Sequence, residues 1–534
     1  MNRRSFELST TDLSSPEDTY VEEYEMNDSE SAISLHDPEQ APAAASSEDS
    51  VTPGSLLGKA PISDDEDPKG IRELSAISSF GVVINAIIGT GFFSVPQTYY
   101  QSGMALSIVM TVFCGLFSML GAAWVLEGVS RARGYDHARK NNIQHNSQMN
   151  IFTFRQIELS EIAYIFAGNK GRIFAFVIFG MYALGSLWAY VSMFASTSAN
   201  LLMLYAIGDP EDCIIESSPS LKCQFTYLMC VVFFAICVML LETMAMDKLA
   251  IFQGFFTIYR FVAFSAILVA CVISLVNNGA FWLKPSDPSI SSNIFRVDPA
   301  GFPGLFSATS FALNCGYNLP NILTPMKRGK KNALKVAMTA LLTAMVIYIG
   351  LSIILSLTLG EDTLQFVILN FARYGKKGFQ RMSDTRVVET NWFSLIIKFV
   401  VMLFPMLNMI SSFPLVCGSI SFNFYSSLPA KAKLALGSLG PVLFRFCVTL
   451  LPFILAAFLP SLGIIIKFCG LSAVFLIIFI PAFFQFYGKR KCGSEWKTPY
   501  SGWWSHNIFV LIAMLYGAFA LIYSIVQFIM DMIK

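Results

Sequence analysis

Apolar residues come in long runs from about residue 76 to the C-terminal end of the chain. A helix needs about 20 such residues to cross the ~30 Å hydrocarbon core of a bilayer. Eleven runs reach that length, so the pattern predicts an all-α membrane protein with eleven transmembrane helices. The predicted spans cover residues 76–99, 103–129, 173–206, 225–244, 250–276, 303–325, 333–359, 393–420, 441–460, 462–487 and 506–530.

The first 70 residues have a different pattern, with no apolar periodicity and many Ser, Pro, Asp and Glu. They hold 17 of the 36 acidic residues but only 4 of the 37 Lys and Arg. A segment of this composition buries too little apolar surface to offset the entropy lost on ordering. We therefore predict a disordered acidic tail at 1–70, which is a candidate site for a cytoplasmic regulator, and an eleven-span domain at 71–534.

Composition excludes several classes of protein. The chain is 54% hydrophobic and 14% charged, with a mean hydropathy of +0.57, whereas an ordinary soluble domain is about a quarter charged. A net charge of +1 without a basic face argues against nucleic-acid binding. The four His lie outside the spans or at their edges, and no CxxC pair occurs. We therefore expect neither an enzyme, nor a metal site, nor a cofactor.

Lys and Arg are concentrated in the loops on the same side as the tail, which favours a cytoplasmic tail and an outer or lumenal C-terminus. In this orientation residues 130–172 form a cytoplasmic loop with an amphipathic helix, and 207–224 and 360–392 are outer loops. The loop 360–392 departs from the rule, because it carries five basic residues on the outer side. Both an endomembrane of the vacuolar or lysosomal kind and the plasma membrane fit the pattern.

Two cysteines differ from those inside the spans. Cys213 and Cys223 share the predicted outer loop 207–224, and that side is oxidising in the secretory pathway. A disulfide between them is one interpretation. Spacing does not establish connectivity, so two free thiols are the alternative.

Two predicted spans contain residues that interrupt a helix. Residues 76–99 include Gly89–Gly91, and residues 303–325 include Asn314–Asn318 followed by Pro320. Backbone groups freed at membrane depth cost several kcal/mol each unless they line a cavity or bind something. Interruptions at corresponding positions of two halves indicate the binding site of a transporter built from a 5+5 inverted repeat, with one extra helix. Close packing through small residues, with an ordinary proline kink, is the alternative.

Three segments carry a more specific pattern: Asn85–Gly91 with Pro96, Ile157–Gly168, and Phe458–Gly463 with Gly470 and Pro481. Together they resemble the amino acid/auxin permease family, which includes sodium-coupled neutral and vacuolar amino acid transporters. The basic insert at 130–156 is similar to an orphan transmembrane-protein branch of that family. The resemblance implies eleven spans, a leucine-transporter-like inverted repeat and secondary transport of amino acids.

The resemblance also suggests residue roles. Asn85 occupies the position of an asparagine that lies near the coupling cation in sodium-coupled relatives. Span 393–420 supplies hydroxyl ligands of that cation in the family, for which Ser411 or Ser412 are candidates here, and Asn408 lies within about one turn of them as a further candidate for the cation. Hydrogen bonding between helices is the alternative role for these residues. The substrate-binding candidates are Gly89, Thr90, Gly91, Ser186, Tyr190, Asn314, Cys315, Gly316 and Asn318.

Arg260 lies about nine residues inside the span 250–276, a depth at which an ionisable residue points to function. Some relatives in the wider superfamily replace the cation by a lysine in this span, and Arg260 is a candidate for the same role. Snorkelling to the membrane surface is the alternative. Because no Asp, Glu or His lies deep in the spans with the interruptions, we expect small neutral substrates.

The leading hypothesis is a secondary active transporter of small neutral amino acids that works by alternating access, with Na+ or H+ as candidate coupling ions. The second is a membrane sensor that binds an amino acid and signals through the tail with little transport. Deleting the tail separates them, because transport survives the deletion and signalling does not.

Overall fold

The computed structural model describes residues 75–151, 157–207, 213, 220–242, 246–285, 293–324, 326, 332–384, 386, 388–426, 428, 434–437 and 439–533. The chain divides into two units, residues 1–60 and 61–534. The predicted tail at 1–70 lies outside the described residues. The description below concerns the second unit.

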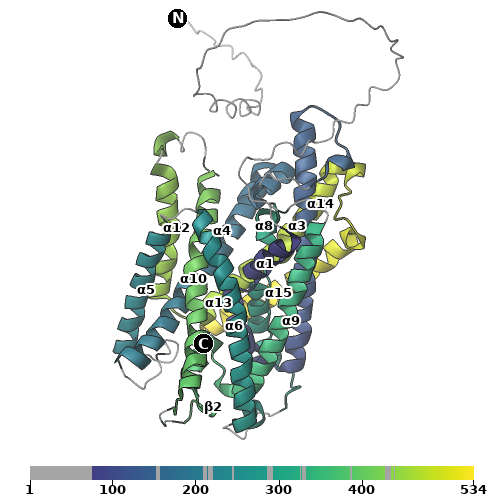
Figure 1. Cartoon of the computed structure of the whole chain (residues 1–534). Helices are drawn as coiled ribbons and strands as arrows, with labels where there is room; N and C mark the ends of the chain where they lie inside the picture. Colours follow the sequence, from purple (N-terminus) through teal and green to yellow (C-terminus); the bar gives the residue numbers. More distant parts are fainter. Residues whose placement is uncertain are drawn as a thin grey trace, which may run out of the picture. The chain divides into compact units, whose positions relative to one another are not determined.

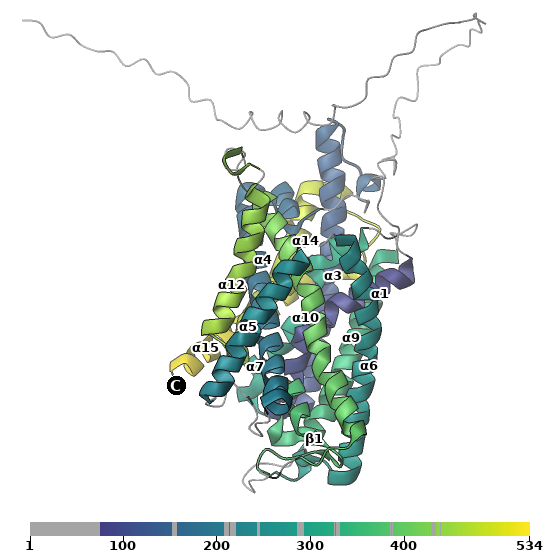
Figure 2. The same ribbon diagram turned by 60° about the vertical axis from the view of Figure 1, so that its left-hand side comes forward.

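The described chain is a bundle of helices (Figures 1 and 2). The helices are α1 Ala76–Ile87, α2 Val95–Ser102, α3 Met104–Lys140, α4 Leu159–Leu202, α5 Leu221–Glu242, α6 Met246–Asn278, α7 Phe302–Ala312, α8 Leu319–Leu323, α9 Ala333–Leu359, α10 Trp392–Ser426, α12 Leu439–Phe458, α13 Leu462–Val474, α14 Ile480–Cys492 and α15 Asn507–Ile533. Short 3-10 segments include η1 Thr90–Ser94, η6 Gly316–Asn318 and η9 Val367–Arg373, and the π-helical turns are η3 Met203–Ile207 and η10 Phe475–Phe479.

Many of these helices are suited to a membrane. Within the described residues, nine helices are long and apolar enough to cross a bilayer, or ten if the bent pair of α1 and α2 is one span. The predicted span 303–325 does not form one continuous helix, because α7 and α8 are separate and short. The chain is therefore a multi-pass membrane protein, while the count of eleven and the inverted repeat stay predictions.

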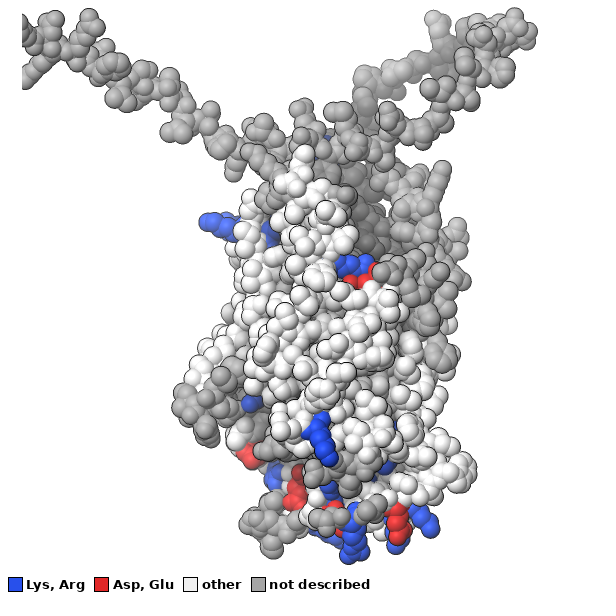
Figure 3. All heavy atoms as spheres, turned by 90° about the vertical axis from the view of Figure 1, so that its left-hand side faces the viewer, with Lys and Arg blue, Asp and Glu red and all other residues white. Residues whose placement is uncertain are grey.

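The surface is consistent with a bilayer environment. Figure 3 shows one face of the molecule, on which a broad uncharged band separates a few charged side chains from a gathering of charge at the lower end. The strands β1 Tyr374–Gly375 and β2 Gly378–Phe379 lie at that end, which we call the hairpin end (Figures 1 and 2). The C-terminal part of α3 lies at the other end, which we call the α3 end.

Two features differ from the sequence-based expectation. The antiparallel pair of β1 and β2 makes the described chain almost, rather than wholly, α-helical. α3 also continues to Lys140, well past the predicted end of its span at residue 129. His137, Arg139 and Lys140 occupy its last turn, and basic side chains there interact favourably with the negative end of the helix dipole.

A buried ion pair holds the α3 end together. Glu127 and Arg131 pair along α3, and neither side chain is exposed to solvent. The Arg131 guanidinium also donates to Gln485 Oε1 of α14 (2.6 Å) and to the Trp496 carbonyl (2.7 Å). The Ser505 hydroxyl donates to Glu127 Oε1 over 2.6 Å. Because the charges are paired and hydrogen-bonded, α3, α14 and the segment before α15 form one connected region.

α7 lies inside the bundle. Nine of its eleven residues are buried, and a helix that is covered on all sides belongs to the interior rather than to the lipid surface. α13, α2 and α3 pack against α7, and α9 packs against both α1 and α2. The two interrupted helix pairs, α1–α2 and α7–α8, are therefore enclosed by longer helices.

Candidate functional site at two helix breaks

The first break separates α1 from α2. α1 starts at the cap Ser75, whose side chain accepts from the Ser78 N–H, and stops at Ile87. Gly89 has an extended backbone, η1 follows, and Pro96 lies in the first turn of α2. The two halves are bent by 46°. Proline is favoured at a helix start, where its missing N–H costs nothing, so the sequence itself specifies where the second half begins.

The second break separates α7 from α8. α7 ends at Ala312, residues 313–315 are not helical, and η6 leads into α8 with Pro320 in its first turn. The predicted interruption at Asn314–Asn318 is therefore present as a break between two helices, and so is the predicted interruption at Gly89–Gly91.

The two breaks lie directly against each other. A Cβ atom on Gly91 would lie 2.6 Å from Ala312 Cα and 2.7 Å from Ala312 N. Real side chains do not approach a backbone that closely, so Gly91 permits the contact by having none. The structure therefore brings the interrupted parts of two spans, more than 200 residues apart in sequence, into one place.

Carbonyl groups freed at the end of α1 find partners on other helices. The Asn85 carbonyl accepts from Arg260 Nη1 of α6 over 2.8 Å. The Ile87 carbonyl accepts from the Tyr348 hydroxyl of α9 over 2.9 Å. The C-terminal end of a helix carries roughly half a negative charge, so a guanidinium and a hydroxyl donor are favourable neighbours there.

The end of α7 is held in a similar way, since the Ser118 hydroxyl of α3 donates to the Leu313 carbonyl over 2.6 Å. Sequence reasoning missed both Tyr348 and Ser118 as partners of the breaks. Each lies in an apolar span that contains several other hydroxyl residues, so the sequence offers no signal that singles it out.

Polar side-chain atoms at the breaks have no partner among the described residues. Both amide atoms of Asn314 and the side-chain oxygen of Asn85 are buried without a hydrogen bond. A buried polar group without a partner costs about 1–3 kcal/mol. Such groups at two adjoining helix breaks are suited to a polar ligand that satisfies them.

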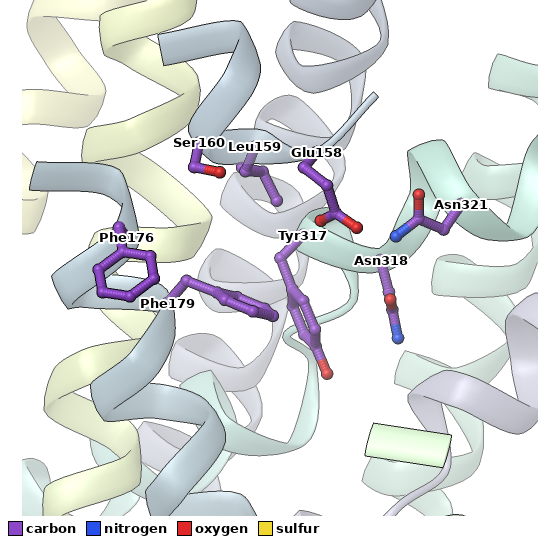
Figure 4. Close-up of a pocket in the computed structure, with 8 residues that line it drawn as sticks. All are labelled: Glu158, Leu159, Ser160, Phe176, Phe179, Tyr317, Asn318 and Asn321. Carbon is purple, nitrogen blue, oxygen red and sulfur yellow. The ribbon is translucent and has the colours of Figure 1, made fainter. Parts of the chain in front are cut away.

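The other predicted substrate residues are spread over a wider region. Ser186 donates to the Tyr182 carbonyl of its own helix over 2.9 Å, and Tyr190 is half-buried within electrostatic range of Arg260. Cys315 is buried and Gly316 lies near Ala122 N of α3. Asn318 lines a separate small cavity at the α3 end (Figure 4). The side chain of Thr90 lies outside the described part of the chain.

Arg260 is buried, with 3% of its surface exposed, and this contradicts the snorkelling alternative. Its guanidinium donates to Asn408 Oδ1 of α10 as well as to the Asn85 carbonyl, and it lies 6.0 Å from the Phe404 ring centre. Ser411 donates to the Asn408 carbonyl of its own helix over 2.9 Å, and Ser412 is half-buried. The guanidinium therefore faces one side-chain oxygen predicted for a cation, Asn408 Oδ1, and the main-chain carbonyl of Asn85, but it does not bond the side-chain oxygen of Asn85.

The breaks are covered on the hairpin side by the segment η9, whose residues 367–372 are all buried. Phe366, just before η9, contacts Phe93 of η1 with ring centres 5.3 Å apart. Lys398 of α10 is 2% exposed, and its Nζ donates to the Ala372 carbonyl at the end of η9 over 2.7 Å. Lys398 thus points into the protein and anchors the covering segment.

Two further predictions concern the loops and metals. Cys213 and Cys223 are joined by a disulfide with a Cα–Cα distance of 5.4 Å. Within the described residues no three His, Cys, Asp or Glu side chains lie close enough together to hold a metal ion.

Comparison with known proteins places the chain in a family. The family model described as "Transmembrane amino acid transporter protein" matches residues 72–530. Transmembrane protein 104 homolog of Drosophila melanogaster is 23% identical over 513 residues, covering 82% of this chain and 94% of that protein. Transmembrane protein 104 of Homo sapiens is 20% identical over 513 residues, covering 85% and 96%.

A relative of the same name from Caenorhabditis elegans, Transmembrane protein 104 homolog, is 25% identical over 355 residues. That match covers 64% of this chain and 66% of the nematode protein, just under two thirds of its length. The similarity to proteins of this name agrees with the orphan branch suggested by the insert at 130–156. The family match spans nearly the whole described bundle, and the chain belongs to the transmembrane amino acid transporter family.

Proposed function

We propose that this protein is a secondary transporter of small neutral amino acids that works by alternating access around the breaks of α1–α2 and α7–α8. The observation that carries the proposal is the contact of the two breaks, with Gly91 against Ala312, beside the buried amide of Asn314, which has no partner among the described residues. An amino acid offers a carboxylate and an ammonium group, which satisfy such donors and acceptors together. Membership of the family supports the same substrate class.

The substrate side chain is neutral and small in this proposal. The interrupted stretches Ile87–Ser94 and Ala312–Asn318 contain no charged residue. A cationic substrate side chain placed there would be buried without a counter-charge, which costs far more than a neutral one. Substrates with apolar or small polar side chains are compatible with the packing of α7 between its neighbours.

Arg260 serves as a built-in cation, so that transport needs no Na+. Its guanidinium donates to the Asn85 carbonyl and to Asn408 Oδ1, which are oxygens of the kind that Na+ would bind. A guanidinium stays charged under all physiological conditions. A sodium ion at the same place would face a full positive charge within a few ångströms, and that repulsion is strong in a low-dielectric interior.

The orientation follows the distribution of Lys and Arg. The α3 end faces the cytoplasm, and the hairpin end with the disulfide faces the outside or an organelle lumen. In this orientation η9 covers the breaks from the outer side.

The test is uptake of radiolabelled amino acids into proteoliposomes that contain the purified chain. We expect uptake of at least one small neutral amino acid, and little uptake of Lys, Arg, Asp or Glu. Gly91→Ala is the matched inactive variant, because it disturbs the contact of the breaks. Binding of an amino acid by folded protein without any uptake would contradict the transporter and favour the sensor.

A further inference from the structure

A pocket of about 470 Å³ lies at the hairpin end, within the range of volumes that hold small organic ligands. Its walls come from the end of α6, the 3-10 segment η4 Phe281–Leu283, the strands β1 and β2 with the turn between them, and described residues of the segment 380–389. None of the residues that line it belongs to the two helix breaks. The pocket is therefore separate from the site proposed for the amino acid.

The turn between the two strands carries two lysines. Gly375 pairs with Gly378 across the strands, so Lys376 and Lys377 form the turn itself. Gly378 has a φ of +106°, a left-handed backbone conformation that glycine adopts without strain. The Lys376 N–H donates to the Glu389 carbonyl over 2.7 Å, which attaches the turn to the segment beside it.

The hairpin is also attached to α6. The Ser274 hydroxyl accepts from the Phe379 N–H over 3.1 Å, and the Asn278 amide donates to the Phe379 carbonyl over 2.8 Å. A Cβ atom on Gly378 would lie 2.5 Å from Ser274 Cα, so the strand lies directly on the helix. Because the backbone of the turn is held from two sides, a ligand that binds there has little backbone to order, and this lowers the entropy cost of binding.

Basic residues outnumber acidic residues in the lining of the pocket. The charged members of the lining are Lys376, Lys377, Arg381, Arg386, Asp384 and Glu389. Arg381 pairs with Glu361 over 2.9 Å, and the closest charged atoms of Arg386 and Asp384 are 3.7 Å apart. Within the described part of the chain, no carboxylate pairs with either lysine of the turn, and both lysines are exposed. Their two ammonium groups are therefore available to a ligand.

The location of these basic residues is unusual for a membrane protein. Lys and Arg normally gather in cytoplasmic loops, whereas the hairpin end faces the outside or a lumen in the proposed orientation. Figure 3 shows Lys and Arg side chains gathered with Asp and Glu at this end. The rule for membrane insertion does not account for the basic residues of the segment 360–392, whereas an anionic ligand does. The excess of positive charge in the pocket itself does not depend on the orientation.

We infer that this pocket binds a small anion that carries phosphate, with Lys376 and Lys377 as its principal partners. Lysine is a common point-charge binder of phosphate, and each ammonium group offers three donors to the phosphate oxygens. The phosphate belongs either to a free solute of the outer or lumenal space or to the headgroup of an acidic lipid. Both sources present the same oxygens to the turn.

The experiment measures equilibrium binding of radiolabelled pyrophosphate to the purified full-length chain in phosphatidylcholine nanodiscs. We expect saturable binding of about one pyrophosphate per chain. The affinity should fall when NaCl is raised from about 50 mM to about 300 mM, because salt screens exposed charges. Binding that does not saturate, or that is unaffected by NaCl, would overturn the inference.

Matched variants locate the site. The double variant Lys376→Gln with Lys377→Gln should weaken binding at least about tenfold. Lys284→Gln should stay within about twofold of wild type, because Lys284 is exposed at the same end but does not line the pocket. Glu389→Gln removes a carboxylate from the lining and should tighten binding about threefold, a gain that a misfolded variant cannot give. Unchanged binding by the double lysine variant would overturn the inference.

Two competitors that carry the same phosphate group separate the possible sources of the anion. These are glycerophosphate and dihexanoyl phosphatidic acid. Stronger displacement of pyrophosphate by the lipid supports a headgroup site, and equal displacement by both supports a site for a free solute. Displacement by neither would overturn the inference. The measurement needs no transport, so its outcome is independent of the uptake experiment.

Discussion

Arg260 shows how a single charge is accommodated inside the bundle. A buried, unpaired guanidinium would cost several kcal/mol, and no carboxylate is bonded to it among the described residues. Its partners are the Asn85 carbonyl at the negative end of α1, the Asn408 amide oxygen and the face of Phe404. Partial charges from three groups on two helices, α1 and α10, thus replace one counter-ion, and this favours a positive charge that stays at this position.

Tyr348 gives the first test at this scale. Tyr348→Phe removes the hydroxyl that donates to the Ile87 carbonyl, and we expect a loss of about 0.5–1.5 kcal/mol in unfolding free energy. Tyr227→Phe is the control. The Tyr227 hydroxyl donates a hydrogen bond of 3.1 Å to the Ala456 carbonyl, and this bond does not involve either break. Both variants should be destabilised to a similar degree, as measured by thermal unfolding.

Transport should separate the two tyrosine variants. We expect Tyr348→Phe to lower amino-acid uptake about tenfold and Tyr227→Phe to leave it within twofold, because only Tyr348 holds the end of a half-helix at the site. Equal uptake by both variants would show that the hydroxyl of Tyr348 has a purely structural role.

Sequence reasoning at this scale identified the unusual residues but not their partners. Arg260, Asn85 and Asn408 stand out as polar groups in apolar runs. Their contacts join residues 175 and 148 positions apart, and no local pattern encodes such pairing. Tyr348 and Ser118 were missed for the same reason, because one hydroxyl in a span is most often satisfied within its own helix.

At the scale of elements, the close approach of the two breaks depends on Gly91. Gly91→Ala places a Cβ 2.6 Å from Ala312 Cα, so the backbone must move. We expect the unfolding free energy to fall by more than about 1 kcal/mol. We also expect the variant to lose most of its amino-acid uptake. Gly81→Ala is the matched control in α1, since nothing lies within 4 Å of a Cβ there. That variant should keep activity and gain up to about 1 kcal/mol from helix propensity.

The two glycine variants are compared by thermal unfolding and by uptake. The informative result is that Gly91→Ala lowers the unfolding free energy while Gly81→Ala raises it, because both changes add one methyl group to the same span. Normal uptake by Gly91→Ala would mean that the breaks need not touch during the transport cycle.

The covering segment η9 depends on Lys398. Lys398→Met removes the donor to the Ala372 carbonyl, and leaving a buried carbonyl unpaired costs about 1–3 kcal/mol. We expect amide hydrogen exchange in residues 363–373 to accelerate about tenfold or more, since local opening becomes easier. Lys335→Met, at an exposed position of α9, should leave exchange in that segment unchanged. Equal exchange in the two variants would show that Lys398 does not hold η9.

The elements themselves were partly accessible from the sequence. Glycine and proline mark both breaks and asparagine marks the second, because each disfavours a continuous helix for a known reason. The segment η9 was not foreseen, since residues 360–392 were predicted as an outer loop from polarity and length. Its six buried residues, of which five are apolar and one is Asn370, are too few for a span, and their burial depends on neighbours distant in sequence.

At the scale of the whole molecule, the multi-pass architecture followed from the apolar runs alone. The count of eleven spans stays a prediction, because a span that is divided into short helices does not register as one long apolar helix among the described residues. The inverted repeat, the orientation and the choice of membrane stay predictions. The dependence of transport on Na+ is also a property of the whole molecule. It is decided by which positive charge balances the negative C-terminal end of α1 while the site opens to either side of the membrane.

The central claim is that Arg260 replaces a coupling cation in an amino acid transporter. The most direct measurement is uptake of a neutral amino acid into proteoliposomes, with equal concentrations of Na+ or choline, for wild type, Arg260→Lys and Arg260→Ala. We expect equal uptake by wild type in both salts, partial uptake by Arg260→Lys, and at least a tenfold loss in Arg260→Ala without Na+. Wild-type uptake that requires Na+, or full Na+-free uptake by Arg260→Ala, would contradict the claim.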